Sequence, residues 1–457
     1  MAPLTALPSP AVARCSAGAR VTPPARAAVL SPVVPVNRVV RWALYVMVFS
    51  LPFEMPNRTT IPFEIPTITA ALFLLTTVFQ PRVCFGRIPP VVFWFIGYLY
   101  ACGVAISVNG WINVVTFTNF FLLITQGILI FWVASNLLRD ERIARAVLWW
   151  FIIACLIRAT LPLIGIGRTA TLVWTGGERV TAFGQNPNIS AVLLSAGVVA
   201  LVGLTYAQGA LRPTVLAWPL MAVLGLAVIE TGSRGGLLAL GVGLVAFMSG
   251  GGRRLWPKVR NALVVLVAIG LLVAASYRSP LIRNRFEATA QSGNMAGREL
   301  IYPAAWHMFL EKPMVGWGPM NNQYEVAIRI GERIKPKRDT HNLILELLTS
   351  TGILGAVPFL VGLGLCVRAA WRARYGARGT VPLALAGVVF MGNMSGNRID
   401  FKLFWLTLAY ALASEHLCAL HPDVFRPGRR YRGARAGKGW LPHEVTAAAN
   451  GPPEETR

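Results

Sequence analysis

The sequence predicts an all-α polytopic membrane protein with about twelve transmembrane helices. The 457 residues are 55% hydrophobic and only 14% charged, with a mean hydropathy of +0.56. A soluble chain of this length needs far more charge on its surface. Apolar runs of about 20 residues, the length that crosses a bilayer, recur along most of the chain. These runs are continuous and do not alternate, which favours helices over a membrane barrel.

The expected spans follow from these apolar runs. They cover 38–53, 66–80, 90–107, 113–137, 143–165, 188–207, 213–230, 235–250, 259–276, 343–370, 380–396 and 401–418. The tenth run is long, so we expect a half-buried helix followed by the true span. The resulting divisions are a disordered leader (1–36), helices one to nine (37–276), a large, partly helical loop (277–342), helices ten to twelve (343–418) and a basic tail (419–457).

The basic residues predict how the chain is oriented. Arginines follow the even-numbered spans, as Arg139 and Arg142 follow the fourth and Arg253 and Arg254 the eighth. Short basic loops stay in the cytoplasm, so both termini are expected to be cytoplasmic and the loops after odd-numbered spans to face outward. The formal net charge of +24 is explained by this loop pattern. We therefore expect membrane lipids, and no nucleic acid, as partners of the chain.

Most of the unusual polar stretches fall on the predicted outer side. They are "ERVTAFGQNPN" (178–188), "ETGSRGG" (230–236), "GRELIYPAAWHMFLEKPMVGWG" (297–318), "RDTHN" (338–342) and "GNRIDFK" (396–402). The loop 277–340 also holds ten basic and six acidic residues. It is long enough to be exempt from the orientation rule, so it is either a solvated segment or a site for an anionic ligand.

Each stretch has a structural and a functional interpretation. Arg234 is either an interfacial arginine in a tight turn or, with glycines beside it, a phosphate ligand. Asn186 or Asn188 caps the sixth span, or contacts a sugar or phosphate. Asp400, near Arg398 and Lys402, forms a surface ion pair or has a functional role.

His341 is one of only five histidines and stands at the start of a predicted helix. The helix dipole and the basic neighbours Lys337 and Arg338 disfavour its protonation, so we expect a neutral imidazole near pH 7 that can accept a proton. Asn342, Glu346 and Thr349 fall on one helical face beside it.

The cysteines and the other histidines show no spacing typical of metal ligands or of a redox pair. We therefore expect neither a metal site nor a cofactor.

The segment "HNLILELLTSTGILG" has His341 and Asn342, nine further residues, and then Gly352 and Gly355. Together with "TGSRGG", "GQNPN", the run at 297–318 and an aspartate before the last span, it resembles the signature of the O-antigen ligase family and its relatives. These relatives are the O-antigen polymerases and the pilin-type protein O-oligosaccharyltransferases. The resemblance covers roughly residues 40–418 in topology and about five short motifs, and the alignment at 298–318 is loose.

The resemblance implies a GT-C-like, metal-independent, inverting glycosyltransferase of the bacterial inner membrane with a periplasmic active site. Its donor would be an undecaprenyl-diphosphate-linked glycan and its acceptor the lipid A-core, with complete lipopolysaccharide as product. Arg234 and Arg298 would bind the diphosphate, because guanidinium groups bind phosphate oxygens in pairs, and His341 would be the base or would orient the acceptor. The candidate substrate-binding residues are Asn342, Glu346, Asp400, Gln185, Asn186, Asn188, Arg179, Lys337, Arg338 and Tyr302.

Several functions compete with a ligase. A polymerase would use the same donor. A protein O-oligosaccharyltransferase usually carries a further C-terminal periplasmic domain, for which the short tail leaves no room. A glycan or lipid transporter is ranked low, because transporters place polar features near the bilayer midplane and often repeat in two halves. The sequence leaves the glycan, the core sugar and the oligomeric state open.

Overall fold

The computed structural model describes residues 35–53, 64–172, 177–206, 216–250, 255–293, 295–332, 336–376, 378–396 and 398–420. The predicted leader up to residue 34 and the tail from residue 421 onward lie outside the described residues. The residues described from 36 to 420 belong to one compact unit.

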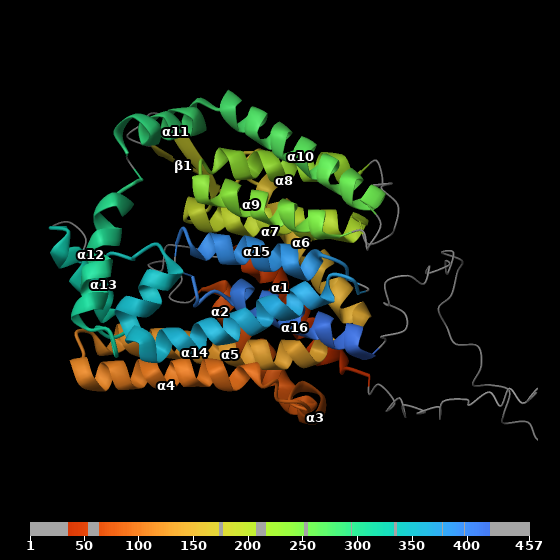
Figure 1. The fold of residues 1–457 in the computed structure, drawn as a ribbon. Coiled ribbons are helices and arrows are strands. Elements are labelled where there is room, and N and C mark those ends of the chain that lie inside the picture. The colour runs from red at the N-terminus through yellow and green to blue at the C-terminus, as the bar shows by residue number, and fades with distance from the viewer. Residues whose placement is uncertain are drawn as a thin grey trace, which may run out of the picture. The chain divides into compact units, whose positions relative to one another are not determined.

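Helices make up most of this unit (Figure 1). They are α1 (Arg38–Ser50), α2 (Ile65–Thr76), α3 (Pro81–Cys84), α4 (Val91–Asn109), α5 (Val114–Leu137), α6 (Glu141–Thr160), α7 (Pro187–Tyr206), α8 (Ala217–Glu230), α9 (Arg234–Ala246), α10 (Leu255–Arg278), α11 (Pro280–Ser292), α12 (Arg298–Glu311), α13 (Asn321–Arg329), α14 (Leu343–Ala373), α15 (Val381–Asn393) and α16 (Lys402–Leu420). Short 3-10 turns continue α1, α2 and α9 at Leu51–Phe53, Thr77–Phe79 and Phe247–Ser249.

Every predicted span coincides with one of these helices to within about five residues. Among the described residues, six helices are long and apolar enough to cross a membrane: α4, α5, α6, α7, α14 and most of α10. Four apolar helices are shorter, namely α2, α8, α9 and α15, with α2 and α9 each counted together with its 3-10 turn. The prediction of an all-α polytopic membrane protein is confirmed, and the large loop is partly helical because it contains α11, α12 and α13.

The long tenth span breaks at Gly352, whose φ of 60° and ψ of −160° interrupt α14. The segment that joins α12 to α13 docks at this break. Trp317 N and Gly318 N donate to the carbonyl oxygens of Thr349 and Ser350, both at 2.8 Å. Ile353 N and Leu354 N, on the other side of the break, donate to Pro313 O at 2.8 Å and Met314 O at 3.1 Å. The backbone groups freed by the break are therefore satisfied by the large loop, as buried backbone groups require.

A two-stranded antiparallel hairpin was not expected from the sequence, and neither was the single turn of α3. β1 (Arg168–Leu172) pairs with β2 (Glu178–Ala182), and Ala170 lies opposite Val180. The strands are short, and β1 is mostly exposed, so they leave no long apolar signal. The β-branched residues in "RTATL" and "ERVTA" are the signal that indicates them. The hairpin matters here because β2 carries Arg179.

The predicted outer polar stretches meet at one end of the helical unit. Arg179 contacts Thr231, Arg298 contacts Ser395, and Lys402 contacts Thr67. The fully buried Trp405 of α16 holds the loop between α15 and α16, because its indole N–H donates to Ile399 O at 2.7 Å. Contacts between sequence-distant loops thus assemble a single polar region.

Candidate functional site

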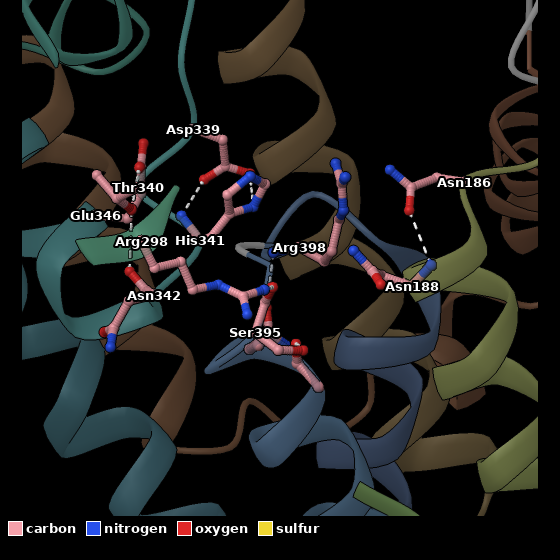
Figure 2. Close-up of polar contacts among 12 residues, drawn as sticks. Asn186, Asn188, Arg298, Asp339, Thr340, His341, Asn342, Glu346, Ser395 and Arg398 are labelled. Carbon is pink, nitrogen blue, oxygen red and sulfur yellow. Dashed lines mark hydrogen bonds and ion pairs between the residues drawn. The ribbon is translucent and has the colours of Figure 1, made fainter. Parts of the chain in front are cut away.

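His341 lies directly between Thr340 and Asn342, the cap residue of α14 (Figure 2). Its backbone is left-handed, with φ of 53°, a conformation that is uncommon for residues other than glycine and that is often found at functional sites. The carboxylate of Asp339 holds this turn by accepting a hydrogen bond from His341 N at 2.9 Å. Asn342 is the N-cap of α14, and its side-chain oxygen accepts hydrogen bonds from Ile344 N and Leu345 N.

The surroundings of His341 keep its imidazole neutral. Burial lowers the pKa of His341, and the nearby guanidinium groups of Arg298, Arg398 and Arg338 lower it further, against the opposing effect of Asp339. The direction agrees with the sequence expectation, although burial and two unforeseen arginine neighbours replace the helix dipole as the physical cause. Within the described residues, Nδ1 of His341 is buried and has no hydrogen-bond partner, and it lies 3.8 Å from Asp339 Oδ2. The ring therefore has one nitrogen that makes no hydrogen bond to the described residues.

His341 and Arg398 share a pocket of about 40 Å³ with Asn186 and Asn188. Gly396 adjoins the ring, since a Cβ there would lie 4.0 Å from His341 Nδ1. Figure 2 shows Arg298, at the start of α12, extending into the same region, where its Nη2 donates to Ser395 O at 2.6 Å. Four separate parts of the chain thus supply the polar walls around His341.

Asn186 and Asn188 make different contacts, and one of them is the predicted helix cap. The side-chain oxygen of Asn186 accepts a hydrogen bond from Asn188 N at 2.9 Å, which is the geometry of a helix cap on α7. The side chain of Asn188 instead accepts from Arg179 Nη2 and from Ser233 Oγ, both at 2.9 Å. Asn188 therefore links the histidine pocket to a group of arginines.

The arginine cluster consists of Arg179, Arg234, Arg285 and Arg298. Arg179 Nε donates to Thr231 O at 2.7 Å, Arg234 Nη1 donates to Arg285 O at 2.9 Å, and Arg285 Nη1 donates to Gly232 O. Burial and the neighbouring guanidinium groups lower the pKa of both Arg179 and Arg285 to about 10. Among the described residues, no carboxylate forms an ion pair with any of the four arginines. Glu299 is near enough to act on Arg234 electrostatically without forming an ion pair, so the cluster keeps an excess of positive charge that suits an anion.

Other predicted site residues have contacts of their own. Gln185 is buried and accepts a hydrogen bond from Arg158 Nη2 at 2.6 Å. Glu346 is buried, and its carboxylate accepts hydrogen bonds from Asn322 at 2.9 Å and Thr340 at 2.8 Å. Both residues brace the loops around the pocket and do not line it.

Three further candidates do not line the pocket and have contacts of their own. Lys337 Nζ donates to Thr116 Oγ1 at 3.2 Å, Arg338 pairs with Glu332 at 3.2 Å, and the Tyr302 hydroxyl makes a long contact of 3.5 Å with His341 O.

Asp400 faces a neighbouring pocket of about 20 Å³ that Glu64 and Lys402 also line. Burial raises the pKa of Asp400, and the charges of Arg398 and Lys402 oppose this effect. Phe401 and Leu403 line both pockets, so Asp400 is adjacent to the histidine pocket without sharing it.

Three residues of this site, Asp339, Arg285 and Arg398, were not among the predicted site residues. Asp339 and Arg398 lie in the polar stretches 338–342 and 396–402, but their neighbours in those stretches were preferred as candidates. Arg285 lies in no such stretch, and its one signal was its place on the same predicted outer side. Across the described residues, no group of three His, Cys, Asp or Glu side chains is placed to hold a metal ion.

Comparison with known proteins bears on this same region. No curated protein sequence matches the chain. Residues 219–360 match a family model described as O-antigen ligase. The matched segment runs from α8 into α14 and contains Arg234, Arg285, Arg298 and His341. This domain supports assigning the chain to the O-antigen ligase and polymerase superfamily, and with it a function of that type.

Proposed function

We propose that the protein is an O-antigen ligase that transfers a glycan from undecaprenyl diphosphate to the lipid A-core oligosaccharide at the periplasmic face of the bacterial inner membrane. The observation that carries the proposal is the junction of two features. A histidine whose pKa is lowered borders a cluster of arginines without carboxylate partners, and Asn188 connects the two. A transfer from a diphosphate carrier needs both features.

The arginine cluster suits the leaving group. When the bond between the sugar's anomeric carbon and the diphosphate oxygen breaks, the electron pair stays on the diphosphate, and its negative charge increases. Guanidinium groups held in place before the reaction stabilise this charge without reorganisation. We assign this role to Arg234, Arg298 and Arg285, with Arg179 oriented by Asn188 beside them.

His341 suits the acceptor. A sugar hydroxyl attacks the anomeric carbon efficiently only if a base removes its proton as the new bond forms. A neutral imidazole with a nitrogen that has no hydrogen-bond partner within the described residues can accept this proton. Attack from the face opposite the diphosphate inverts the anomeric centre, and undecaprenyl diphosphate leaves. Asp339 would stabilise the imidazolium that results, since its carboxylate lies 3.8 Å from Nδ1.

The test uses purified protein, an undecaprenyl-diphosphate glycan and lipid A-core, with EDTA and without nucleotide. The wild type is expected to produce glycan-capped lipid A-core, detected by gel and mass spectrometry. The His341→Ala and Arg285→Ala variants should lose this product. His307→Ala and Arg283→Ala are matched controls, because His307 and Arg283 are solvent-exposed residues of the same large loop.

The same reaction separates ligase from its alternatives. Extension of the polyprenyl-linked glycan, with lipid A-core unchanged, would identify a polymerase and refute the ligase assignment. Transfer to a protein acceptor would identify an O-oligosaccharyltransferase. Movement of donor across a membrane without a new glycosidic bond would identify a transporter.

A further inference from the structure

A second basic site lies at the end of the helical unit opposite the candidate functional site. It consists of Arg87, between α3 and α4, Arg139, just after α5, and His416 of α16. The length of α4 separates it from the large loop, because this helix begins four residues after Arg87 and its last residue, Asn109, accepts a hydrogen bond from Lys312 at 2.6 Å. A helix of 19 residues is about 28 Å long. Figure 1 shows α3 beside the N-terminal end of α4.

The fold holds Arg87 in place. Its carbonyl oxygen accepts hydrogen bonds from Trp132 Nε1 at 2.8 Å and Asn136 Nδ2 at 2.9 Å, both on α5. Its guanidinium Nη1 lies 3.2 Å from His416 Nε2. A guanidinium can only donate, so Nε2 accepts this hydrogen bond, which uses one of the five N–H donors of Arg87. His416 therefore positions Arg87 and leaves donors for a ligand.

Arg139 lies near Arg87 and has a buried atom without a partner. Its Nε is buried and makes no hydrogen bond to the described residues. Burial lowers the pKa of Arg139, and the charge of Arg87 lowers it further. Within the part of the chain that the structure describes, no carboxylate forms an ion pair with either arginine. Two guanidinium groups are thus held near each other without an acid bound to them.

Acidic residues stand close by in the sequence, but each is engaged elsewhere. Glu141 pairs with Arg378 at 2.9 Å, and Glu415 pairs with Arg372 at 3.0 Å. Asp140 caps α6 by accepting hydrogen bonds from backbone N–H groups of its first turn. The orientation rule accounts for arginines at this end of the unit, but not for two that share a partly buried place without an acid. An anion from outside the chain would balance their charge.

The surroundings favour a lipid as the source of this anion. Val78 and Phe79, just before α3, and Ile88, beside Arg87, are exposed apolar side chains. Arg139 follows the end of the predicted span α5 by two residues. A bilayer that covers the exposed apolar side chains would therefore place its headgroup phosphates at the level of the two arginines.

We propose that Arg87 and Arg139 bind the phosphate of an anionic phospholipid in the leaflet predicted to face the cytoplasm. His416 positions Arg87 for this contact, and the acyl chains of the lipid cover the exposed apolar side chains beside α3. The inference does not depend on the proposed transfer reaction, because the second basic site lies at the other end of the unit.

The test measures lipid binding to the full-length protein in detergent by native mass spectrometry. The wild type is expected to bind phosphatidylglycerol more tightly than phosphatidylcholine, whose headgroup has no net charge. Arg87→Ala and Arg139→Ala should each weaken phosphatidylglycerol binding by about tenfold, because each removes charge-assisted hydrogen bonds to the phosphate. The side chain of Arg87 is exposed, so its replacement leaves the packing intact, and the result does not depend on how the Arg139 variant folds.

Arg82→Ala is the matched control. Arg82 is an exposed arginine of α3, so its replacement removes the same charge at the same end of the unit and should leave phosphatidylglycerol binding unchanged. An equal loss of binding in Arg82→Ala would indicate general attraction between charges and overturn the proposal. Equal binding by the wild type, Arg87→Ala and Arg139→Ala would overturn it as well. Binding of glycerophosphoglycerol, the headgroup without acyl chains, as tightly as phosphatidylglycerol would identify a soluble phosphate ester as the ligand and refute the lipid assignment.

Discussion

The break in α14 provides a prediction whose magnitude can be worked from the structure. Gly352 combines φ of 60° with ψ of −160°, a region that is essentially restricted to glycine. A Cβ at this position would overlap the backbone C and O of Met314 and lie 2.6 Å from Pro313 O. The Gly352→Ala variant must therefore distort the backbone and push the docked segment away.

Both effects contribute to the expected loss of stability. The backbone conformation costs an alanine about 1–3 kcal/mol. Displacing the segment weakens four hydrogen bonds, from Trp317 N, Gly318 N, Ile353 N and Leu354 N, each of which contributes about 0.5–1.5 kcal/mol. The sum, about 3–9 kcal/mol, is comparable to the whole stability of many folded domains. We expect a large fall in melting temperature, or failure to accumulate in the membrane.

The assay is thermal unfolding of purified protein in detergent, with Gly364→Ala as the control. Gly364 belongs to the same helix, has no positive φ, and has no atom within 4 Å of the position that a Cβ would take. Its replacement should be neutral or slightly stabilising, because alanine favours a helix over glycine by about 1 kcal/mol. If Gly352→Ala melts like Gly364→Ala, the break does not depend on glycine and the reasoning is wrong.

Three further predictions concern the site. Because the pKa of His341 is lowered, its reaction with diethylpyrocarbonate should decline only when the pH falls below 6.5. In the Arg298→Ala variant this decline should move to higher pH. A decline centred at pH 6.5 in both proteins would contradict the assigned environment. Asn322→Ala should destabilise the protein by about 1–3 kcal/mol, because the buried Glu346 carboxylate loses a hydrogen-bond donor. Since Thr340 also donates to Glu346, the variant should change the rate at which diethylpyrocarbonate labels His341. An unchanged rate would show that this network does not position the histidine. Asn186→Ala should lower the free energy of unfolding by about 1 kcal/mol, because α7 loses its cap. Asn188→Ala should instead weaken the binding of geranyl diphosphate, because Arg179 loses the side chain that orients it. The reverse pattern would refute these assignments.

Membrane helices were predictable because a bilayer imposes one simple requirement. Each span must be apolar along its whole length and must satisfy its own backbone, so the twelve predicted runs coincide with helices. Even the irregular tenth span was expected, since a run as long as 343–370 exceeds one bilayer thickness. The sequence did not indicate which segment docks at Gly352. The contact between residues 313–318 and this break depends on how the large loop folds back.

The gathering of the candidate residues was predictable to the extent that they belong to short motifs at helix ends. His341, Arg234 and Arg298 were identified in this way, and the structure brings each of them to the same end of the unit. Glu346 lies on α14 as predicted, but its carboxylate contacts Asn322 and Thr340 and does not line the pocket. Helical periodicity predicts which face of a helix a residue occupies, but not what that face contacts. Arg285 and Arg398 needed tertiary contacts that connect α11 to Gly232 and the α15–α16 loop to His341.

The arginine cluster is itself an argument for function. Arg179 and Arg285 are buried beside other guanidinium groups, and both effects lower their pKa to about 10, which means that the fold holds these charges together against repulsion and desolvation. Elsewhere in the large loop the chain pairs its cations with acids, as Arg329 does with Glu311 and Glu325. Because no such ion pair joins the cluster's arginines to an acid among the described residues, we expect the cluster to bind an external anion. Binding of that anion to the folded state should then stabilise the protein, in proportion to its concentration relative to the dissociation constant.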